Sequence, residues 1–170
     1  MQRLIILRGC MASGKSTIAK KYRSFHDKTA WIKVDNFKEL FDHFEKGARP
    51  VVHGAANASL EYLLRNGYSV VMEGVFQNVL FIDQAVQVAQ KQHIPCKVFA
   101  LQVSLETLQK RDKVRVGVKE GCREALGDEE MAHIFNNIEK NPYADAIPLD
   151  TEKLSVEAAM EFIDAKFENV

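Results

Sequence analysis

The sequence lacks long apolar runs and has few cysteines. No run approaches the roughly 18 apolar residues that a membrane-spanning helix requires, and the apolar run at 4–7 is too short for a signal peptide. The three cysteines, Cys10, Cys96 and Cys122, are few and odd in number, which does not suit a disulfide framework and is typical of a protein from a reducing compartment. We therefore expect a cytoplasmic protein with no membrane partner.

The sequence also lacks an excess of charge of either sign. Lys plus Arg and Asp plus Glu are 23 each, so the formal net charge is zero. Proteins that bind nucleic acid non-specifically are usually basic, so the zero net charge argues against nucleic acid as the main partner, although a local basic groove stays open. The five histidines show no metal-ligand spacing. With 46% hydrophobic residues over 170 positions, the composition is that of one folded domain spanning 1–170, which we expect to be a monomer or weak dimer.

Short apolar runs alternate with segments of helical periodicity. Strands are predicted at 4–7, 30–34, 68–72, 95–103 and 147–149, and helices at 15–23, 36–45, 55–65, 81–92, 105–115, 128–140 and 156–167. This alternation predicts a three-layer α/β/α fold with a five-stranded, mainly parallel sheet. Ligands of such sheets bind beyond the carboxyl ends of the strands. Gly9, Asp35 and Glu73 follow the first three predicted strands, so we expect all three at one edge.

A glycine-bounded loop lies between the first strand and the first helix. Residues 9–16 fit G-x-x-x-x-G-K-[ST], the Walker A pattern of phosphate-binding loops, without a mismatch. Backbone N–H groups of such a loop form an anion-binding nest, and the following helix presents its positive end to the phosphates. A chance glycine turn is the alternative, and the strand–loop–helix context argues against it. The residues predicted to bind nucleotide are Gly9, Cys10, Met11, Ala12, Ser13, Gly14, Lys15, Ser16 and Thr17.

The last residues of this loop have separate predicted roles. Lys15 places a charge on the β- and γ-phosphates, Ser16 offers a hydroxyl to Mg²⁺, and Thr17 is placed to bond an α-phosphate oxygen. ATP and Mg²⁺ are therefore the expected cofactors. The Asn-Lys-x-Asp motif of common GTPases and the Leu-Ser-Gly-Gly-Gln signature of transporter ATPases are both absent. Motor ATPases end an apolar strand in two acids, whereas here Glu73 stands alone.

The chain resembles the phosphate-loop small-molecule kinases, including adenylate, shikimate and gluconate kinases, chloramphenicol phosphotransferase, zeta-toxin-like kinases and AAA-type ATP-binding domains grouped with them. The resemblance is carried, in order, by the loop at 9–16, by segments 34–37 and 71–74, by segment 103–106 leading to two arginines, and by segment 147–151. It implies transfer of the ATP γ-phosphate to a small acceptor, often a hydroxyl. It also implies that the loop after 149 borders the adenine.

Four residues are candidate acceptor contacts. Asp35 lies where these kinases often carry a carboxylate that accepts the acceptor's proton, although it could simply cap a helix. Phe37 could stack on a flat acceptor or pack in the core; it stands where shikimate kinases have a second Asp. Glu73 is suited to an acceptor hydroxyl or a Mg²⁺-bound water, or is a surface acid. Gln77 is either an acceptor contact or ordinary loop polarity.

A short helical lid is predicted at about 111–127. Arg111 and Arg115 are four residues apart, so a helix projects both from one face. There they are suited to stabilise the charge on the γ-phosphate during transfer. A solvated basic helix face is the alternative. Arg123 is a reserve candidate. Glycines at 117, 121 and 127 would permit hinge motion. Two other functions stay open: a kinase acting on a polynucleotide end, and a nucleotide-dependent switch without efficient transfer.

Overall fold

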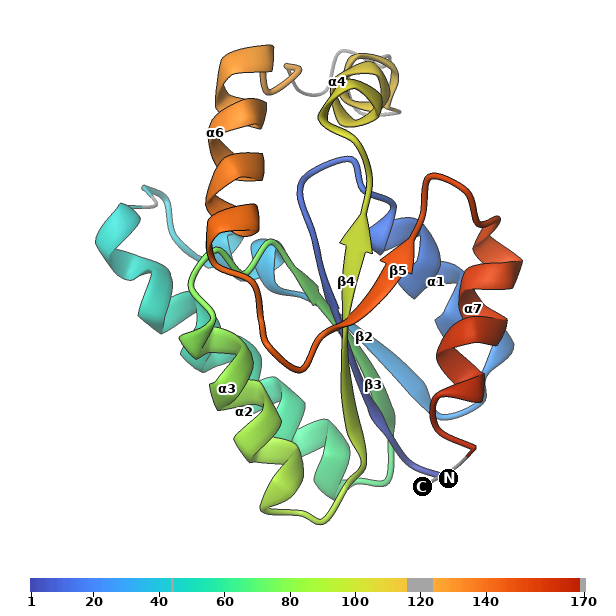
Figure 1. Ribbon diagram of the computed structural model, residues 1–170. Helices are drawn as coiled ribbons and strands as arrows, with labels where there is room; N and C mark the ends of the chain where they lie inside the picture. The colour runs from blue at the N-terminus through green and yellow to red at the C-terminus, as the bar shows by residue number, and fades with distance from the viewer. Residues whose placement is uncertain (44, 116–123, 169–170) are drawn as a thin grey trace.

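The computed structural model describes residues 1–43, 45–115 and 124–168. Five strands form one sheet in the order β2-β3-β1-β4-β5, and every pair is parallel. The strands are β1 (Leu4–Arg8), β2 (Thr29–Lys33), β3 (Ser69–Gly74), β4 (Cys96–Gln102) and β5 (Ile147–Asp150). Helices cover both faces of the sheet, which confirms the predicted three-layer α/β fold (Figure 1).

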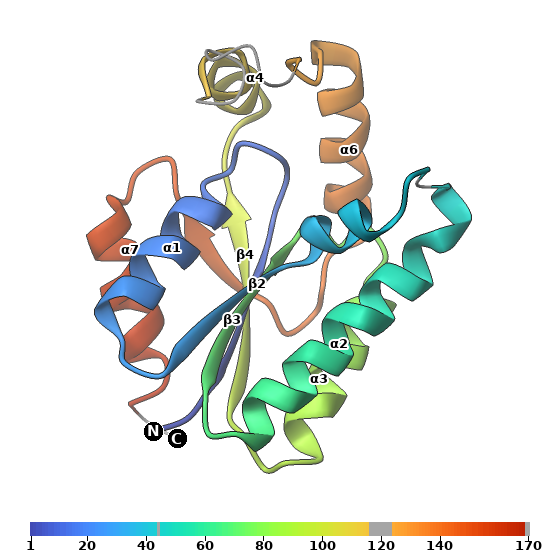
Figure 2. The same cartoon turned by 180° about the vertical axis from the view of Figure 1, so that it is seen from behind.

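The central strand β1 divides its side chains between two cores. Leu4 and Ile6 pack with α2 (Arg49–Arg65) and α3 (Leu80–Gln90) on one face. Ile5 and Leu7 pack with α1 (Lys15–Phe25) and α7 (Val156–Ala165) on the other, as Figures 1 and 2 show from opposite sides. A strand covered on both faces must be apolar at every position, which is why the run at 4–7 identified β1.

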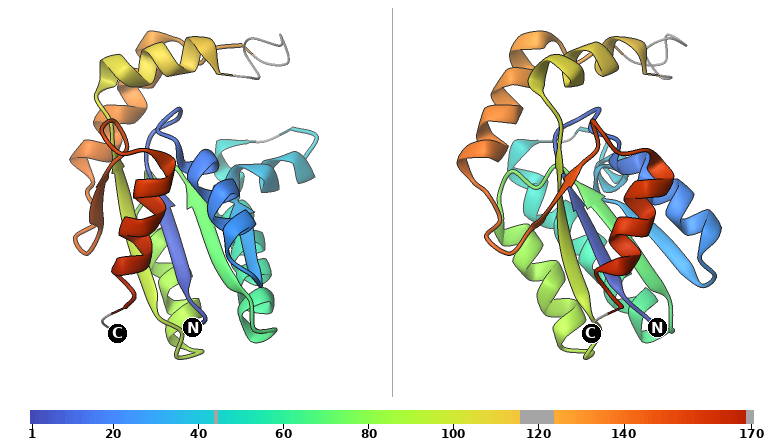
Figure 3. Two further views of the ribbon diagram at one scale, coloured as in Figure 1. Left: turned by 90° about the vertical axis from the view of Figure 1, so that its right-hand side faces the viewer. Right: turned by 45° about the vertical axis from the view of Figure 1, so that its right-hand side comes forward.

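Two further helices stand beyond the carboxyl ends of the strands. They are α4 (Leu105–Val114) and α6 (Asp128–Lys140), and α4 lies above the loop that follows β1 (Figure 3). The Ser104 side chain caps α4 by accepting the N–H of Thr107 at 3.3 Å. A third apolar cluster, which includes Cys10, Leu108 and Met131, joins this pair of helices to the loop. The predicted lid at about 111–127 includes 116–123, which lie outside the described residues.

The predicted helix at 36–45 is wrong. The chain instead forms a 3₁₀ helix, η1 (Val34–Leu40), and a short turn, η2 (Lys46–Ala48), before α2 begins at Arg49. Phe37 and Phe41 still pack against the α2 core, so their spacing reflects burial without an α-helix. α2 begins at Arg49, earlier than the helix predicted at 55–65, because Pro50 fits the first turn of a helix.

Within the described parts of the chain, every helix is too short or too polar to span a lipid bilayer.

Candidate nucleotide and acceptor site

The loop between β1 and α1 has the backbone that its glycines allow. Gly14 precedes α1 with φ +97°, and Ala12 also has a positive φ of +61°. A Cβ on Gly9 would lie 2.8 Å from Ser13 Oγ and 3.1 Å from Leu101 Cβ, so this position has no room for a side chain. The first glycine is therefore needed for close packing and the second for a left-handed backbone.

Lys15 is buried, and its ammonium lies across the loop. Its Nζ donates to the carbonyl oxygens of Gly9 (2.9 Å) and Cys10 (2.7 Å) and to Ser13 Oγ (3.4 Å). Burial lowers the pKa of Lys15, and the charges of Glu73 and, more weakly, Cys10 and Asp35 oppose that shift. An ammonium held by three neutral oxygens gains a charged partner when a phosphate enters, which favours anion binding here.

Cys10 contributes to the loop through its backbone. Its thiol is buried and donates to the Met131 sulfur at 3.4 Å, and burial raises the pKa of the Cys10 thiol. The side chain therefore joins the loop to α6 and faces away from the anion site.

A cavity of about 390 Å³, here called the Asp35 cavity, lies beside the loop. Its walls come from the ends of β2 and β3, from α2, α3 and α6, and from the end of α4. Of the predicted residues it brings together Asp35, Gln77 and Arg115, together with Met11 of the loop. Phe37 does not line it, because its ring packs against the core. Gln77 is held in place by Asn137, whose Nδ2 donates to its Oε1 at 3.3 Å.

Asp35 has a basic neighbour on its own 3₁₀ turn. Lys38 Nζ forms an ion pair with Asp35 Oδ1, and both side chains are close to two-fifths exposed. The first turn of η1 thus presents a carboxylate to the cavity at the end of β2, and the lysine one turn later fixes its orientation. The helix-capping role that the sequence left open is not seen, since no side chain caps η1.

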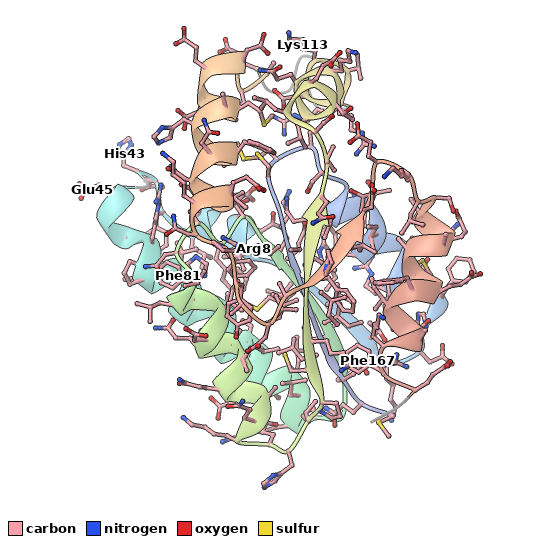
Figure 4. The ribbon with its side chains drawn as sticks, in the orientation of Figure 1. Arg8, His43, Glu45, Phe81, Lys113 and Phe167 are labelled. Carbon is pink, nitrogen blue, oxygen red and sulfur yellow. The ribbon has the colours of Figure 1, made fainter. Side chains whose placement is uncertain are left out.

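An aromatic wall lines the same cavity. The His53 ring stacks on Phe81 with 3.7 Å between ring centroids, and the planes differ by 4°. Burial lowers the pKa of His53 to about 4, so the imidazole is neutral near pH 7. The sequence does not single out Phe81 as a site residue, because an apolar residue at that position suits the buried face of any helix. Its stacking on His53 depends on α2 and α3 lying side by side. Figure 4 shows Phe81 at the start of α3, below the foot of α6.

Glu73 lies in a different place from Asp35. β3 runs through Gly74, so Glu73 is inside the strand, 2% exposed, on the face covered by α1. Its Oε1 accepts the indole N–H of Trp31 at 3.1 Å. It does not line the Asp35 cavity. The alternative of a surface acid is therefore excluded, and the Glu73 carboxylate acts electrostatically on Lys15.

The two candidate lid arginines face two different cavities. Arg111 Nη2 donates to the Thr151 carbonyl at 3.0 Å and lines a second cavity of about 330 Å³, the Arg111 cavity, with Gly14 and Thr17 of the loop. Arg115 lines the Asp35 cavity. The two side chains therefore do not meet at one site, although they lie four residues apart; α4 ends at Val114, and Arg115 follows it as the C-cap residue.

The loop after β5 borders the Arg111 cavity. Thr151 Oγ1 donates to the Ser13 carbonyl at 2.8 Å, which ties this loop to the phosphate loop. Glu152 instead turns to the start of α4, where its carboxylate accepts the Ser104 N–H and hydroxyl at 2.9 and 2.8 Å. The cavity thus has the phosphate loop on one side and segment 151–156 on the other.

A buried arginine, which the sequence did not single out, connects the site to α6. Arg8 donates to the carbonyls of Phe76 (3.2 Å), Ile138 (3.5 Å) and Asn141 (2.5 Å). Burial lowers the pKa of Arg8. Figure 4 shows it between the upper end of the sheet and the foot of α6. The sequence could not predict this role of Arg8, because its partners are all backbone carbonyls of residues distant in sequence.

The oxygen donors present fit Mg²⁺ held jointly with a nucleotide. No cluster of three or more His, Cys, Asp or Glu suited to a metal ion occurs in the described residues. Mg²⁺ usually takes one or two protein oxygens together with substrate phosphates and water. Ser16, in the first turn of α1, offers a hydroxyl, and Glu73 is a carboxylate on the face that α1 covers.

Comparison with known proteins gives a family and a fold. A family model described as an AAA domain matches residues 4–136. The tunicamycin resistance protein of Deinococcus radiodurans has a similar structure, with TM-score 0.72, 14% identity, and 99% of this chain and 96% of that chain covered. A gluconokinase from Sinorhizobium meliloti 1021 has TM-score 0.69 and 16% identity, with 98% and 94% covered. A chain of the Pnkp1/Rnl/Hen1 RNA repair complex has TM-score 0.65 and 18% identity, but only 44% of it is covered against 82% of this chain.

No curated protein matches this chain. At these identities the solved structures support the fold, while the family model spans more than half of the chain. The sequence's resemblance to phosphate-loop kinases is thereby confirmed at the level of family and fold. The chain belongs to the AAA domain family and has the fold of a phosphate-loop kinase.

Proposed function

We propose that this protein is a phosphotransferase that moves the γ-phosphate of ATP, with Mg²⁺, to a hydroxyl of a small-molecule acceptor. The observation that carries the proposal is the pair of cavities on either side of the phosphate loop. The Arg111 cavity has loop residues and segment 151–156 around it, which suits a nucleotide. The Asp35 cavity has a carboxylate, an amide and an arginine, which suits an acceptor.

Each residue of the two cavities and the loop has a separate role in the proposed transfer. Lys15 and the loop N–H groups bind the β- and γ-phosphates, and Arg115 reaches the charge that spreads over the γ-oxygens. Asp35 orients the acceptor hydroxyl and takes its proton. The acceptor oxygen forms a bond to the γ-phosphorus while the bond from that phosphorus to the β–γ bridging oxygen breaks, leaving ADP. Ser16 would help to hold Mg²⁺, which neutralises phosphate charge when bound.

Asp35 and Lys15 are electrostatically linked across the site. The charge of Asp35 is among those acting on the Lys15 ammonium. The Asp35 cavity also includes Met11 of the phosphate loop, so an acceptor bound there would lie beside the phosphates. This link supports Asp35 as the proton acceptor.

A kinase acting on a polynucleotide end is the second candidate. The likeness to a chain of an RNA repair complex favours it. The zero net charge and a 390 Å³ cavity, which suits one small molecule, favour the first. A nucleotide-dependent switch without transfer is the third, and the Asp35 cavity beside the loop argues for an acceptor instead.

Several further properties belong to the same proposal. We infer a single domain over 1–170 whose lid spans about 111–127, working as a monomer or weak dimer in the cytoplasm. Gly117, Gly121 and Arg123 of that lid lie outside the described residues.

The test is ATP turnover by the purified chain with Mg²⁺ and a panel of polyols, sugar acids, nucleosides, amino sugars and 5′-hydroxyl oligonucleotides. Acceptor-dependent ADP release with a matching phosphorylated product supports the proposal. Asp35→Asn should retain nucleotide binding in calorimetry and lose about 10²- to 10⁴-fold in transfer, the usual contribution of a general base. Lys15→Ala should lose nucleotide binding. Turnover with oligonucleotides alone would select the second candidate, and tight binding without transfer to any acceptor would select the third.

A further inference from the structure

Trp31 is the only tryptophan of the chain and lies on the edge strand β2. In the sheet, Trp31 is in register with Val71, so its side chain shares a face with Glu73, two residues further along β3. Its indole Nε1 donates to Glu73 Oε1 at 3.1 Å. The edge strand thus reaches a carboxylate on its neighbour.

Glu73 depends on that indole. The carboxylate is 2% exposed, and the Trp31 N–H is the one side-chain donor that it has within the described residues. A buried carboxylate without a donor is costly, so this bond fixes where the oxygen atoms lie.

Glu73 and Lys15 attract each other but do not pair. Glu73 is the strongest favourable charge acting on the Lys15 ammonium. Yet the ammonium donates to two loop carbonyls and Ser13 Oγ, and no ion pair joins it to Glu73 in the part of the chain described. Opposite charges at a buried site attract strongly, because the local dielectric constant is low. Something must therefore hold the carboxylate clear of the lysine.

We propose that Trp31 is a positioning residue for the bound nucleotide: its indole N–H holds the Glu73 carboxylate clear of Lys15, so that the ammonium stays available to phosphate. The inference rests on the proposed function only in taking a nucleoside triphosphate as the ligand. Two cations also lie over the indole ring, Lys20 at 5.5 Å and Arg23 at 5.6 Å from its centroid. Without the donor, Glu73 would turn to Lys15, and phosphate would have to displace it.

The test compares Trp31→Phe in two backgrounds. The phenyl ring keeps most of the packing and removes the N–H. Binding of a non-hydrolysable ATP analogue with Mg²⁺, measured by calorimetry without acceptor, should weaken about tenfold in the otherwise unchanged chain, the range for a hydrogen bond to a charged group. In a Glu73→Gln chain the same change should cost less than about twofold, because a neutral amide forms no ion pair with Lys15.

Arg23→Met is the matched control, since it removes a cation from the indole face and leaves the N–H in place; its analogue binding should equal that of the parent. Equal losses from Trp31→Phe in both backgrounds would mean that Trp31 only packs, and no loss in the first background would overturn the proposal outright. Because no acceptor is present, a chain that binds the analogue but phosphorylates nothing refutes the proposed function and leaves this inference standing. A parent that binds no analogue overturns both.

Discussion

Arg115 and Asp112 form an ion pair at the end of α4, with 2.9 Å between Nη2 and Oδ1. The Asp112 side chain is 4% exposed, and its Oδ2 accepts the N–H of Leu126 at 2.6 Å. One buried carboxylate therefore holds both an arginine of the Asp35 cavity and the chain that leads into α6.

Asp112→Ala should destabilise the protein and impair transfer together. Removing one partner of a buried ion pair leaves the other charge uncompensated; since Arg115 is about one-quarter exposed, we expect a loss of about 2 to 3 kcal/mol in the free energy of unfolding. The acceptor kcat/KM should fall as far as in Arg115→Ala. Urea denaturation and steady-state kinetics measure the two effects.

The control for that loss is Asp128→Asn. Asp128 pairs with Lys113 at 2.9 Å, but both side chains are more than half exposed. An exposed pair contributes under about 1 kcal/mol, so this variant should unfold almost as the parent does. If Asp112→Ala were no less stable than Asp128→Asn, the holding role of Asp112 would be wrong.

Arg111→Ala and Arg115→Ala should separate nucleotide from acceptor effects. Arg111 lines the cavity beside Gly14 and Thr17, so its loss should weaken nucleotide binding with little change in the acceptor KM. Arg115 lines the Asp35 cavity, so its loss should lower the acceptor kcat/KM while the nucleotide Kd changes less than about twofold. Calorimetry with the nucleotide and kinetics at varied acceptor concentration measure the split. The same profile in both variants would refute the two-cavity assignment.

The sequence predicted what depends on local pattern. β1 and its loop were readable because a doubly covered strand must be apolar throughout and because Gly9 and Gly14 are required by packing and backbone. The 3₁₀ backbone of segment 34–40 could not be predicted in this way, because Phe37 and Phe41 are buried at a spacing that an α-helix also gives. Periodicity reports burial, and more than one backbone satisfies it.

The rest of the site depends on strand register and on the partners of individual side chains. Glu73 was expected after its strand, but β3 continues to Gly74, and strand alternation then places the carboxylate under α1. Its bond to Trp31 exists because β2 and β3 pair in one particular register, which no local pattern encodes. Arg111 and Arg115 line different cavities because their side chains have different partners, the Thr151 carbonyl and the Asp112 carboxylate, which the spacing alone does not reveal.

His53 should make the protein less stable as the pH falls from about 6.5 to about 4. Its folded pKa is lowered to about 4 by burial, whereas the unfolded chain has the ordinary value near 6.5. Between these values the unfolded state takes up a proton that the folded state does not, so folding stability is present above pH 6.5 and is lost on acidification. Allowing for the partial exposure of the ring, we expect about 1 to 2 kcal/mol.

The measurement is urea denaturation at pH 7 and pH 4.5 for the parent, His53→Gln and His133→Gln. The first variant should show a smaller fall in stability between the two pH values than the parent. His133, which is exposed on α6, serves as the control and should behave as the parent does. An unchanged fall in His53→Gln would assign the acid sensitivity to other groups.

Gly9→Ala and Gly54→Ala should change stability in opposite directions. The new Cβ at position 9 would lie 2.8 Å from Ser13 Oγ, so Ser13 must move, and the Cβ of Leu101 at 3.1 Å leaves no other room. We expect a loss of about 1 to 3 kcal/mol from overpacking. Because Ser13 Oγ is also an acceptor for Lys15, the ATP-analogue Kd should rise.

Gly54 offers the contrasting case within α2. No heavy atom lies within 4 Å of a Cβ built there, and the position is exposed in the interior of the helix. Alanine restricts the unfolded chain and keeps the helix, so stability should rise by about 0.5 to 1 kcal/mol with no change in analogue binding. Urea denaturation and calorimetry on both variants decide the matter. A Gly9→Ala chain that kept the parent's stability and analogue Kd would show that the loop can open at its first residue, and the close packing of Gly9 against Ser13 would then not be what shapes the anion site.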